Sequence, residues 1–184
     1  TGYNGIKPEE VKPFPVGLRI LAGNPNNNRP ADKSKWEDLH FGYSCIDGTD
    51  KFYGWTSEIP NCPVGSTLVM NINFPQCWDG VNLDSPDHQS HMSYTVDRKC
   101  PATHPVPLVA ITFNVDYQVK EVDAPKYWRL SSDVYAKTLP SGYSGHADWF
   151  FGWKKEVMES FIKNCDQAAK DCASHMLGDG RVIF

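Results

Sequence analysis

Alternating apolar and polar residues predict β-strands through most of the chain. The clearest example runs from Val109 to Val119, where every second residue is apolar. The polar residues on its other face are Thr112, Asn114, Asp116 and Gln118. Residues 68–74 alternate in the same way. Successive side chains on a strand point to opposite faces, so each of these segments is predicted to bury its apolar face in a core.

Three further segments have strand-like patterns: residues 16–22, 36–45 and 127–135. Residues 24–31, Asn-Pro-Asn-Asn-Asn-Arg-Pro-Ala, consist largely of turn-forming residues and predict a loop. The proline-rich residues 1–15 predict an extended lead-in, because proline disfavours helix at the residue before it.

The apolar period changes after Gly145. Apolar residues then recur at spacings of three and four, at Phe150, Trp153, Val157, Phe161 and Ile162. This spacing predicts an amphipathic helix at the end of the chain. Strands first and one helix last predict a mainly β fold, an antiparallel sandwich or jelly-roll-like domain with one C-terminal amphipathic helix. We expect residues 1–184 to form a single domain.

Six cysteines add covalent constraints to this fold. They are Cys45, Cys62, Cys77, Cys100, Cys165 and Cys172, and no Cys-x-x-Cys occurs among them. An even count without zinc-ribbon spacing favours disulfides, a stapled domain and an oxidising, extracellular location. Several connectivities are open, and we predict pairing between neighbours: Cys45–Cys62, Cys77–Cys100 and Cys165–Cys172. Seven helical residues would span about 10 Å, too far for a disulfide, so the last bridge requires the helix to end between its cysteines.

Charge and hydropathy exclude two kinds of partner. The net charge is −4, and no run of basic residues is longer than Lys154-Lys155, so nucleic acid is not expected as a partner. No apolar run is long enough for a membrane span. The chain also lacks the Gly-x-Ser-x-Gly, P-loop, dinucleotide and His-Glu-x-x-His motifs of common enzyme classes.

The densest candidate chemistry lies between Phe74 and Tyr94. Four residues that can transfer protons fall within eight positions: Asp84, Asp87, His88 and His91. The run Asp-Ser-Pro-Asp from Asp84 is typical of a helix start, and a single helical turn there would put His88 and His91 on one face. We interpret the four residues as candidate catalytic groups.

A second constellation is Ser144-Gly-His-Ala-Asp-Trp149. His146 could act as a general base with Asp148 as its orienting carboxylate, and both join the catalytic candidates. The alternative is that Ser144 or Asp148 caps the last helix and His146 is structural. A divalent metal is possible on His88, His91 and His146, but nothing in the sequence requires a cofactor.

Residues near the first constellation could hold a substrate. Trp78 is a candidate stacking surface, and the other candidate substrate-binding residues are Asp79, Tyr94 and His104. The alternative for Cys77-Trp-Asp-Gly80 is a disulfide-pinned turn whose tryptophan belongs to the core.

Four motifs together resemble a known family. They are Phe74-Pro-Gln-Cys-Trp-Asp-Gly, Leu83-Asp-Ser-Pro-Asp-His-Gln-Ser-His-Met, Cys100-Pro-Ala-Thr-His-Pro-Val-Pro and His146-Ala-Asp-Trp. In this order they resemble a secreted domain of unknown function found in fungi and actinobacteria, in fungi often fused to WSC carbohydrate-binding modules. The resemblance extends from about Pro13 to Cys172. It implies secretion and a cell-wall or polysaccharide context, but no mechanism.

The resemblance also implies a missing part. Members of that family carry an upstream His-x-His-Asp-Phe-Phe-Gly segment, which this sequence lacks. We therefore expect an upstream segment of the same precursor, either cleaved or not included, or a shortened member of the family.

Three functions are compatible with these observations. The leading hypothesis is a secreted polysaccharide- or cell-wall-active hydrolase or lyase with a pocket of His and Asp side chains. The second is a non-catalytic glycan-binding or extracellular structural domain. The third is a metal site based on the histidines.

Overall fold

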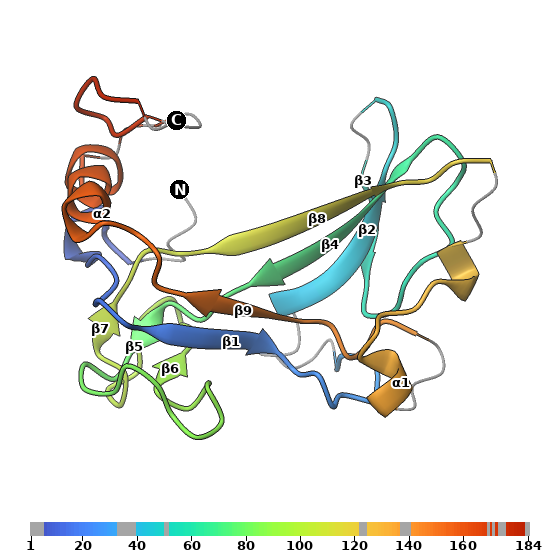
Figure 1. Ribbon diagram of the computed structural model, residues 1–184, viewed down its shortest axis with the longest axis horizontal. Helices are drawn as coiled ribbons and strands as arrows, with labels where there is room; N and C mark the ends of the chain where they lie inside the picture. Colours follow the sequence, from blue (N-terminus) through green and yellow to red (C-terminus); the bar gives the residue numbers. More distant parts are fainter. Residues whose placement is uncertain are drawn as a thin grey trace. The chain divides into compact units, whose positions relative to one another are not determined.

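The chain folds mainly into antiparallel β-strands (Figure 1). The computed structural model describes residues 6–32, 40–49, 52–121, 125–136, 141–168, 170, 172 and 176–182. The strands are β1 (Arg19–Gly23), β2 (Phe41–Ile46), β3 (Phe52–Thr56), β4 (Thr67–Asn73), β5 (Cys77–Trp78), β6 (Met92–Ser93), β7 (Val106–Pro107), β8 (Thr112–Gln118) and β9 (His146–Phe150). The helices are α1 (Asp133–Ala136) and α2 (Lys155–Phe161). The predicted fold class, mainly β with one C-terminal amphipathic helix and disulfide staples, is confirmed.

The chain forms two compact units. Unit 1 contains residues 1–21, 74–111 and 148–184, and unit 2 contains residues 22–73 and 112–147. Strands β1 and β9 pair in a two-stranded sheet, and each strand has residues in both units.

Unit 2 is built on a four-stranded sheet in the order β3-β2-β4-β8 (Figure 1). The central strand β4 alternates as the sequence predicts. Leu68 and Ile72 are fully buried on one face, whereas Asn71 and Asn73 on the other are only partly buried. The predicted two-sided strand at residues 68–74 is therefore confirmed, within one residue at each end.

The prediction that the next strand buries its apolar face is wrong. β8 lies at the edge of the sheet, and among the described strands it pairs only with β4. Phe113 and Tyr117 are 37% and 40% exposed, and Val115 is only half-buried. Periodicity shows that a strand has an apolar face, but not whether another layer covers that face.

The predicted strand over residues 127–135 is also wrong. A 3-10 turn occupies Pro125–Tyr127, and the short helix α1 begins at Asp133. The Asp133 carboxylate is 1% exposed and accepts hydrogen bonds from the backbone N–H groups of Leu130 (2.8 Å) and Gly142 (2.9 Å). It also accepts one from the Ser144 hydroxyl at 2.7 Å. A buried carboxylate that satisfies three donors fixes this segment as a folded turn.

Unit 1 contains the small sheet β6-β5-β7 and several buried segments around it. The N-terminal segment differs from the predicted extended lead-in, because it contains a turn and buried apolar side chains. Pro8–Glu10 form a 3-10 turn, and Val11 and Phe14 are 0% and 5% exposed. The ring of Phe14 packs 4.4 Å from that of Trp149 in β9, measured between centroids. Residues 6–15 thus contribute to the core of this unit.

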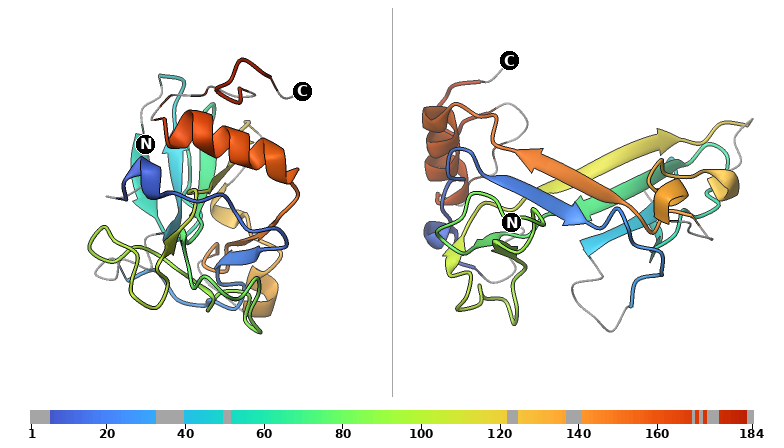
Figure 2. Two further views of the ribbon diagram at one scale, coloured as in Figure 1. Left: turned by 90° about the vertical axis from the view of Figure 1, so that its left-hand side faces the viewer. Right: turned by 60° about the horizontal axis from the view of Figure 1, so that its bottom comes forward.

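The C-terminal helix begins later than its apolar spacing suggests. Phe150 belongs to β9 and Trp153 precedes the helix, and both are exposed. From Lys155 the helix continues through a π-helical turn, Ile162–Asp166, as one rod (Figure 2). Met158 and Ile162 form its buried stripe, with 4% and 1% exposure.

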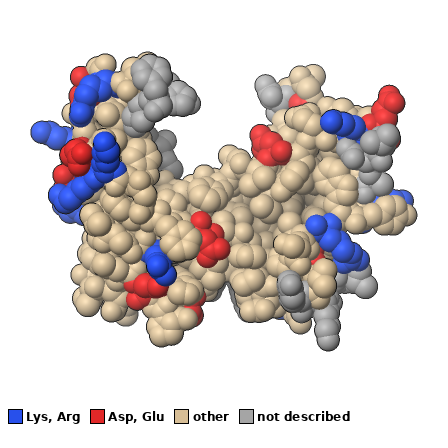
Figure 3. Space-filling model, in the orientation of Figure 1, with Lys and Arg blue, Asp and Glu red and all other residues tan. Residues whose placement is uncertain are grey.

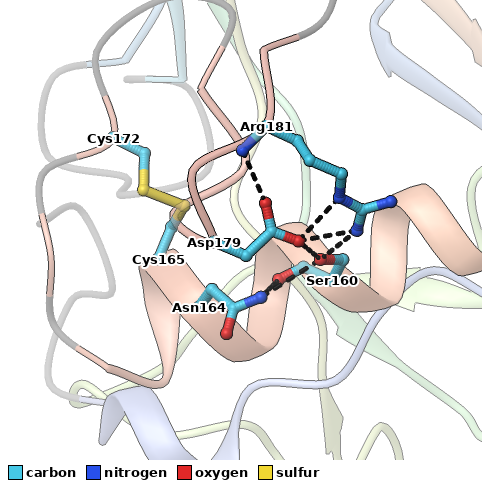
Figure 4. Close-up of a disulfide and its surroundings, with 6 residues drawn as sticks. All are labelled: Ser160, Asn164, Cys165, Cys172, Asp179 and Arg181. Atoms are coloured by element: carbon cyan, nitrogen blue, oxygen red, sulfur yellow. Dashed lines mark hydrogen bonds and ion pairs between the residues drawn. A yellow bond between two sulfur atoms is a disulfide. The ribbon is translucent and has the colours of Figure 1, made fainter.

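All three predicted disulfides are present: Cys45–Cys62, Cys77–Cys100 and Cys165–Cys172. The helix ends at Asp166, before Cys172, as that bridge requires. The tail is held by a second contact, in which Asp179 accepts hydrogen bonds from Ser160 on α2 and from Arg181 (Figure 4). The disulfide and this polar cluster hold Cys172, Asp179 and Arg181 against the helix.

Charged side chains are dispersed. On the face that Figure 3 shows, basic and acidic residues are interleaved, and the described Lys and Arg residues form no continuous patch there. None of the helices in the described part of the chain is both long enough and apolar enough to cross a membrane.

Candidate functional site

The loop between Trp78 and Met92 in unit 1 is organised by three aspartates. Each accepts hydrogen bonds from backbone N–H groups that follow it: Asp79 from Val81 and Asn82, Asp84 from Ser85, and Asp87 from Gln89 and Ser90. These are the local side-chain-to-backbone bonds that make aspartate a turn former. The loop therefore consists of successive turns, and the predicted helical turn after Asp84 is wrong.

The same loop lies along β1. The N–H of Arg19 donates to the carbonyl of Leu83 at 3.0 Å, and the N–H of Leu21 donates to that of His88 at 2.9 Å. These two bonds fix the position of His88 relative to the Arg19 side chain. His88 also has a φ of 57°, a left-handed conformation that is uncommon for residues other than glycine.

His88 and His91 do not converge, contrary to the prediction. His91 is 1% exposed; its Nε2 donates to the carbonyl of Arg19 at 2.7 Å and its Nδ1 contacts the Ser85 hydroxyl at 2.8 Å. A carbonyl oxygen can only accept, so Nε2 carries a proton. Both ring nitrogens of His91 are engaged inside the protein, and its role is to tie the loop to β1.

His88 is the accessible histidine of the pair. Its side chain is 51% exposed, and its Nδ1 lies 2.7 Å from Oδ1 of Asp84. The other oxygen of that carboxylate lies 3.9 Å from the Arg19 guanidinium. The hydrogen bond from His88, with smaller contributions from the Ser85 N–H and Arg19, lowers the pKa of Asp84. Asp84 is therefore ionised and orients His88 with its proton on Nδ1.

A small cavity of about 80 Å³ opens beside this pair. Its lining includes Arg19 and His88 together with Asp148, Trp149 and Phe150 of β9. The Arg19 guanidinium lies 5.3 Å above the centre of the Phe150 ring, a cation–π arrangement that limits where the arginine can point. The cavity thus joins a cation, an imidazole and the predicted catalytic residue Asp148 within unit 1.

Asp87 is less suited to chemistry. Its Oδ1 accepts hydrogen bonds from the N–H groups of Ser90 and Gln89 and from the hydroxyls of Ser85 and Ser90. The bond from the Ser90 N–H, followed by those from Ser85 and Gln89, lowers the pKa of Asp87 strongly. These contacts make Asp87 the structural centre of its turn.

His146 lies on β9 in unit 2 and is half-buried. Its Nδ1 donates to the carbonyl of Ser144 at 3.0 Å. Ser144 itself is fully buried and bonded to Asp133. Neither Ser144 nor Asp148 caps a helix, since the residues that follow them form a strand.

The predicted substrate-binding residues of unit 1 mostly support loop structure. Trp78 donates through Nε1 to the carbonyl of Asn82 at 2.6 Å, and His104 through Nε2 to that of Ser90 at 3.1 Å. Burial alone would raise the pKa of Asp79, but its hydrogen bonds from Val81 and Asn82 lower it. Partial burial raises the pKa of Tyr94.

The proposed metal ligands do not form a cluster. Among the described residues, no three His, Cys, Asp or Glu side chains lie together in a way that could hold a metal ion. His91 has no ring nitrogen left for a ligand bond, which removes it from the predicted set.

Comparison with known families identifies the chain. A family model matches residues 2–153. The chain belongs to the DUF1996 family, a domain of unknown function. The match includes the His88 loop, β1 and β9, whereas α2 and the Cys165–Cys172 bridge follow it. No curated protein and no solved structure matches this DUF1996 chain.

Arg19 is the residue of this DUF1996 site that sequence reasoning missed. Nothing in the segment around it suggests a function, and Asp84 and His88 lie 65 and 69 positions further along the chain. Only the pairing of β1 with the loop carbonyls brings Arg19 to Asp84 and His88.

Proposed function

We propose that this DUF1996 protein is a secreted, polysaccharide-active enzyme in which the Asp84–His88 pair transfers a proton. The supporting observation is the 2.7 Å contact between Asp84 Oδ1 and His88 Nδ1, beside Arg19 and the small cavity. Among the described residues, none hydrogen-bonds to Nε2 of His88. With the proton held on Nδ1, the lone pair on Nε2 can act as a general base.

The charges favour elimination over hydrolysis. Glycoside hydrolysis by paired carboxyl groups requires one of them to be protonated, with a raised pKa. Asp84, the carboxylate paired with His88, has a lowered pKa and therefore stays ionised. A histidine base next to an arginine is suited instead to removing a proton from a carbon atom that is bonded to a carboxylate.

The substrate class that needs this pair is a uronate-containing polysaccharide. Arg19 would bind the uronate carboxylate, for which the planar guanidinium is suited, and stabilise the charge that develops on it. His88 Nε2 would accept the proton from the carbon next to the carboxylate. The bond from the neighbouring carbon to the leaving sugar oxygen then breaks, that oxygen takes up a proton from water, and a carbon–carbon double bond forms.

Secretion is part of the proposal. Three disulfides link all six cysteines, which is typical of proteins that mature in an oxidising compartment. Extracellular polysaccharide is accessible to such a protein.

The test is a screen of the purified protein on polygalacturonate, alginate and polyglucuronate, with the ultraviolet absorbance of the unsaturated uronate as readout. The variant His88→Asn should reduce the rate by about 10²- to 10⁴-fold, the usual contribution of a general base. Asp97→Asn is the matched control, since Asp97 is an exposed turn residue that also has a positive φ. Equal rates for the wild-type protein and His88→Asn would reject this role for His88.

A further inference from the structure

A second site lies in unit 2, on the polar face of the four-stranded sheet. A groove of about 590 Å³ runs over β2, β4 and β8, with Trp55 of β3 at its side. This volume is within the range of ligand-binding sites in proteins. It is separate from the His88 site, and no residue is shared between the two linings.

The strand register aligns the residues that form the floor of this groove. Asn71 of β4 pairs with Gly42 of β2 and with Asn114 of β8, and Val69 pairs with Ser44 and Asp116. Paired residues on neighbouring strands point to the same face. The floor therefore carries mainly polar side chains, with apolar positions at Ile46 and at Val69, which is 8% exposed.

Side-chain amides form a hydrogen-bonded ladder across the strands. Asn71 donates through Nδ2 to Asn114 Oδ1 at 2.6 Å and accepts from Asn73 at 3.0 Å, and Thr112 donates to Asn73 at 2.7 Å. These bonds fix the orientation of each amide before any ligand arrives. Polar groups that are already ordered lose little conformational entropy when a ligand binds, and this favours binding.

The ladder leaves groups that can bind a ligand. An asparagine amide has two N–H donors, and Asn114 uses neither of them with described residues. One N–H of Asn71 is also unused there. Asp116 is exposed, and its carboxylate makes no hydrogen bond or ion pair with the residues that the structure describes. Fixed donors and a free acceptor thus lie side by side.

Trp55 gives the groove an aromatic wall. A Cβ atom at Gly42 would lie 2.1 Å from the Trp55 indole, so the tryptophan packs directly on the glycine backbone. Only glycine leaves room for the ring in this position. Trp55 is half-buried, so part of the residue is accessible to solvent.

We propose that this groove binds a neutral polysaccharide chain. Sugar hydroxyls both donate and accept, as the amides and Asp116 require, while the apolar face of a sugar ring can stack on Trp55. Asp116 lines the groove, and its carboxylate would repel the negative charge of a uronate or a phosphate. The inference is independent of the proposed enzyme activity, because the two sites favour different sugar units.

The test uses the whole protein and oligosaccharides of β-glucan, xylan, mannan and chitin, with oligogalacturonate as the acidic comparison. Binding is followed by calorimetry and by NMR of the asparagine side-chain amides. At least one neutral oligosaccharide should bind and shift the side-chain amide signals of Asn71 and Asn114. Failure of every neutral oligosaccharide to bind, or shifts that leave these two residues unchanged, would overturn the proposal.

Two variants locate the binding. Trp55→Ala and Asn114→Ala should each weaken it by about tenfold or more, which corresponds to about 1.4 kcal/mol. Tyr127→Ala is the aromatic control, because Tyr127 is 73% exposed and does not line the groove. Unchanged affinity in Trp55→Ala, or stronger binding of oligogalacturonate than of any neutral oligosaccharide, would also overturn the proposal. Loss of cleavage in His88→Asn with intact glycan binding would separate the two sites.

Discussion

His88 combines a positive φ of 57° with a 2.7 Å hydrogen bond from Nδ1 to Oδ1 of Asp84. A left-handed backbone costs a residue with a Cβ roughly 1–2 kcal/mol. The turn bonds around the residue keep it there, since His88 donates to the carbonyl of Ser85 and accepts from the N–H of Leu21. Strain held in this way is common where a side chain must point in one direction.

This conformation can be tested by stability. Asparagine adopts positive φ more easily than most residues, whereas a β-branched residue does so with difficulty. We expect His88→Val to be at least about 1 kcal/mol less stable than His88→Asn. Urea denaturation of both variants measures the difference. Equal stability of the two would show that the backbone at this position is not held left-handed.

Asp84 is expected to act as a positioning residue for His88. In Asp84→Asn the charged acceptor at Nδ1 is lost, so His88 should populate both tautomers and its activity on a polyuronate should fall by about 100-fold. Nitrogen NMR of the imidazole reports the tautomer directly. A lower rate with an unchanged tautomer would indicate that Asp84 acts only through structure.

The loop that carries His88 is expected to be sensitive to acid. The folded pKa values of Asp79, Asp84 and Asp87 lie below the unfolded value of about 3.9. Their contribution to the free energy of unfolding is therefore present above about pH 4 and is lost as the pH falls through the folded values. Thermal unfolding followed from neutral pH downward should show Tm falling in that range.

The variant Asp87→Asn provides the comparison for that measurement. The asparagine side chain has no carboxyl group that could take up a proton. The Tm of this variant should therefore fall less steeply with acid than that of the wild-type protein. A wild-type Tm that stays constant to below about pH 3 would contradict the lowered pKa values.

The Cys77–Cys100 bridge is expected to contribute more stability than Cys165–Cys172. The two bridges join cysteines separated by 23 and 7 residues. Closing the longer loop restricts the unfolded chain more, and its removal should cost about 3 kcal/mol. Denaturation of the two double alanine variants compares them. A larger loss from the Cys165–Cys172 pair would mean that native packing, not loop closure, decides the difference.

Sequence patterns predicted well which residues share a face of a strand, but predicted poorly which other elements pack against that face. The alternation at Leu68 to Phe74 gave the central strand, because a residue and its neighbours suffice to define a face. The same alternation at Phe113 did not reveal that β8 is an edge strand. Sequence order says which residues share a face but not what packs against it.

The candidate site was found in part for a similar reason. The density of Asp and His marked the loop of Asp84 and His88, but a spacing of three was interpreted as a helical turn. In the structure the turn instead has a left-handed φ at His88, and His91 is buried. Arg19 and the ladder of Asn71 and Asn114 depend on pairing between distant segments, which spacing along the chain does not contain.

The most direct test of the proposed chemistry is mass spectrometry of the products formed from a polyuronate. Elimination yields chains ending in an unsaturated uronate, lighter by one water than the products of hydrolysis. We predict the unsaturated product from the wild-type protein and from Asp97→Asn, and its loss in His88→Asn. Products that contain no unsaturated uronate, or no cleavage of any polyuronate by the wild-type protein, would contradict the proposed function.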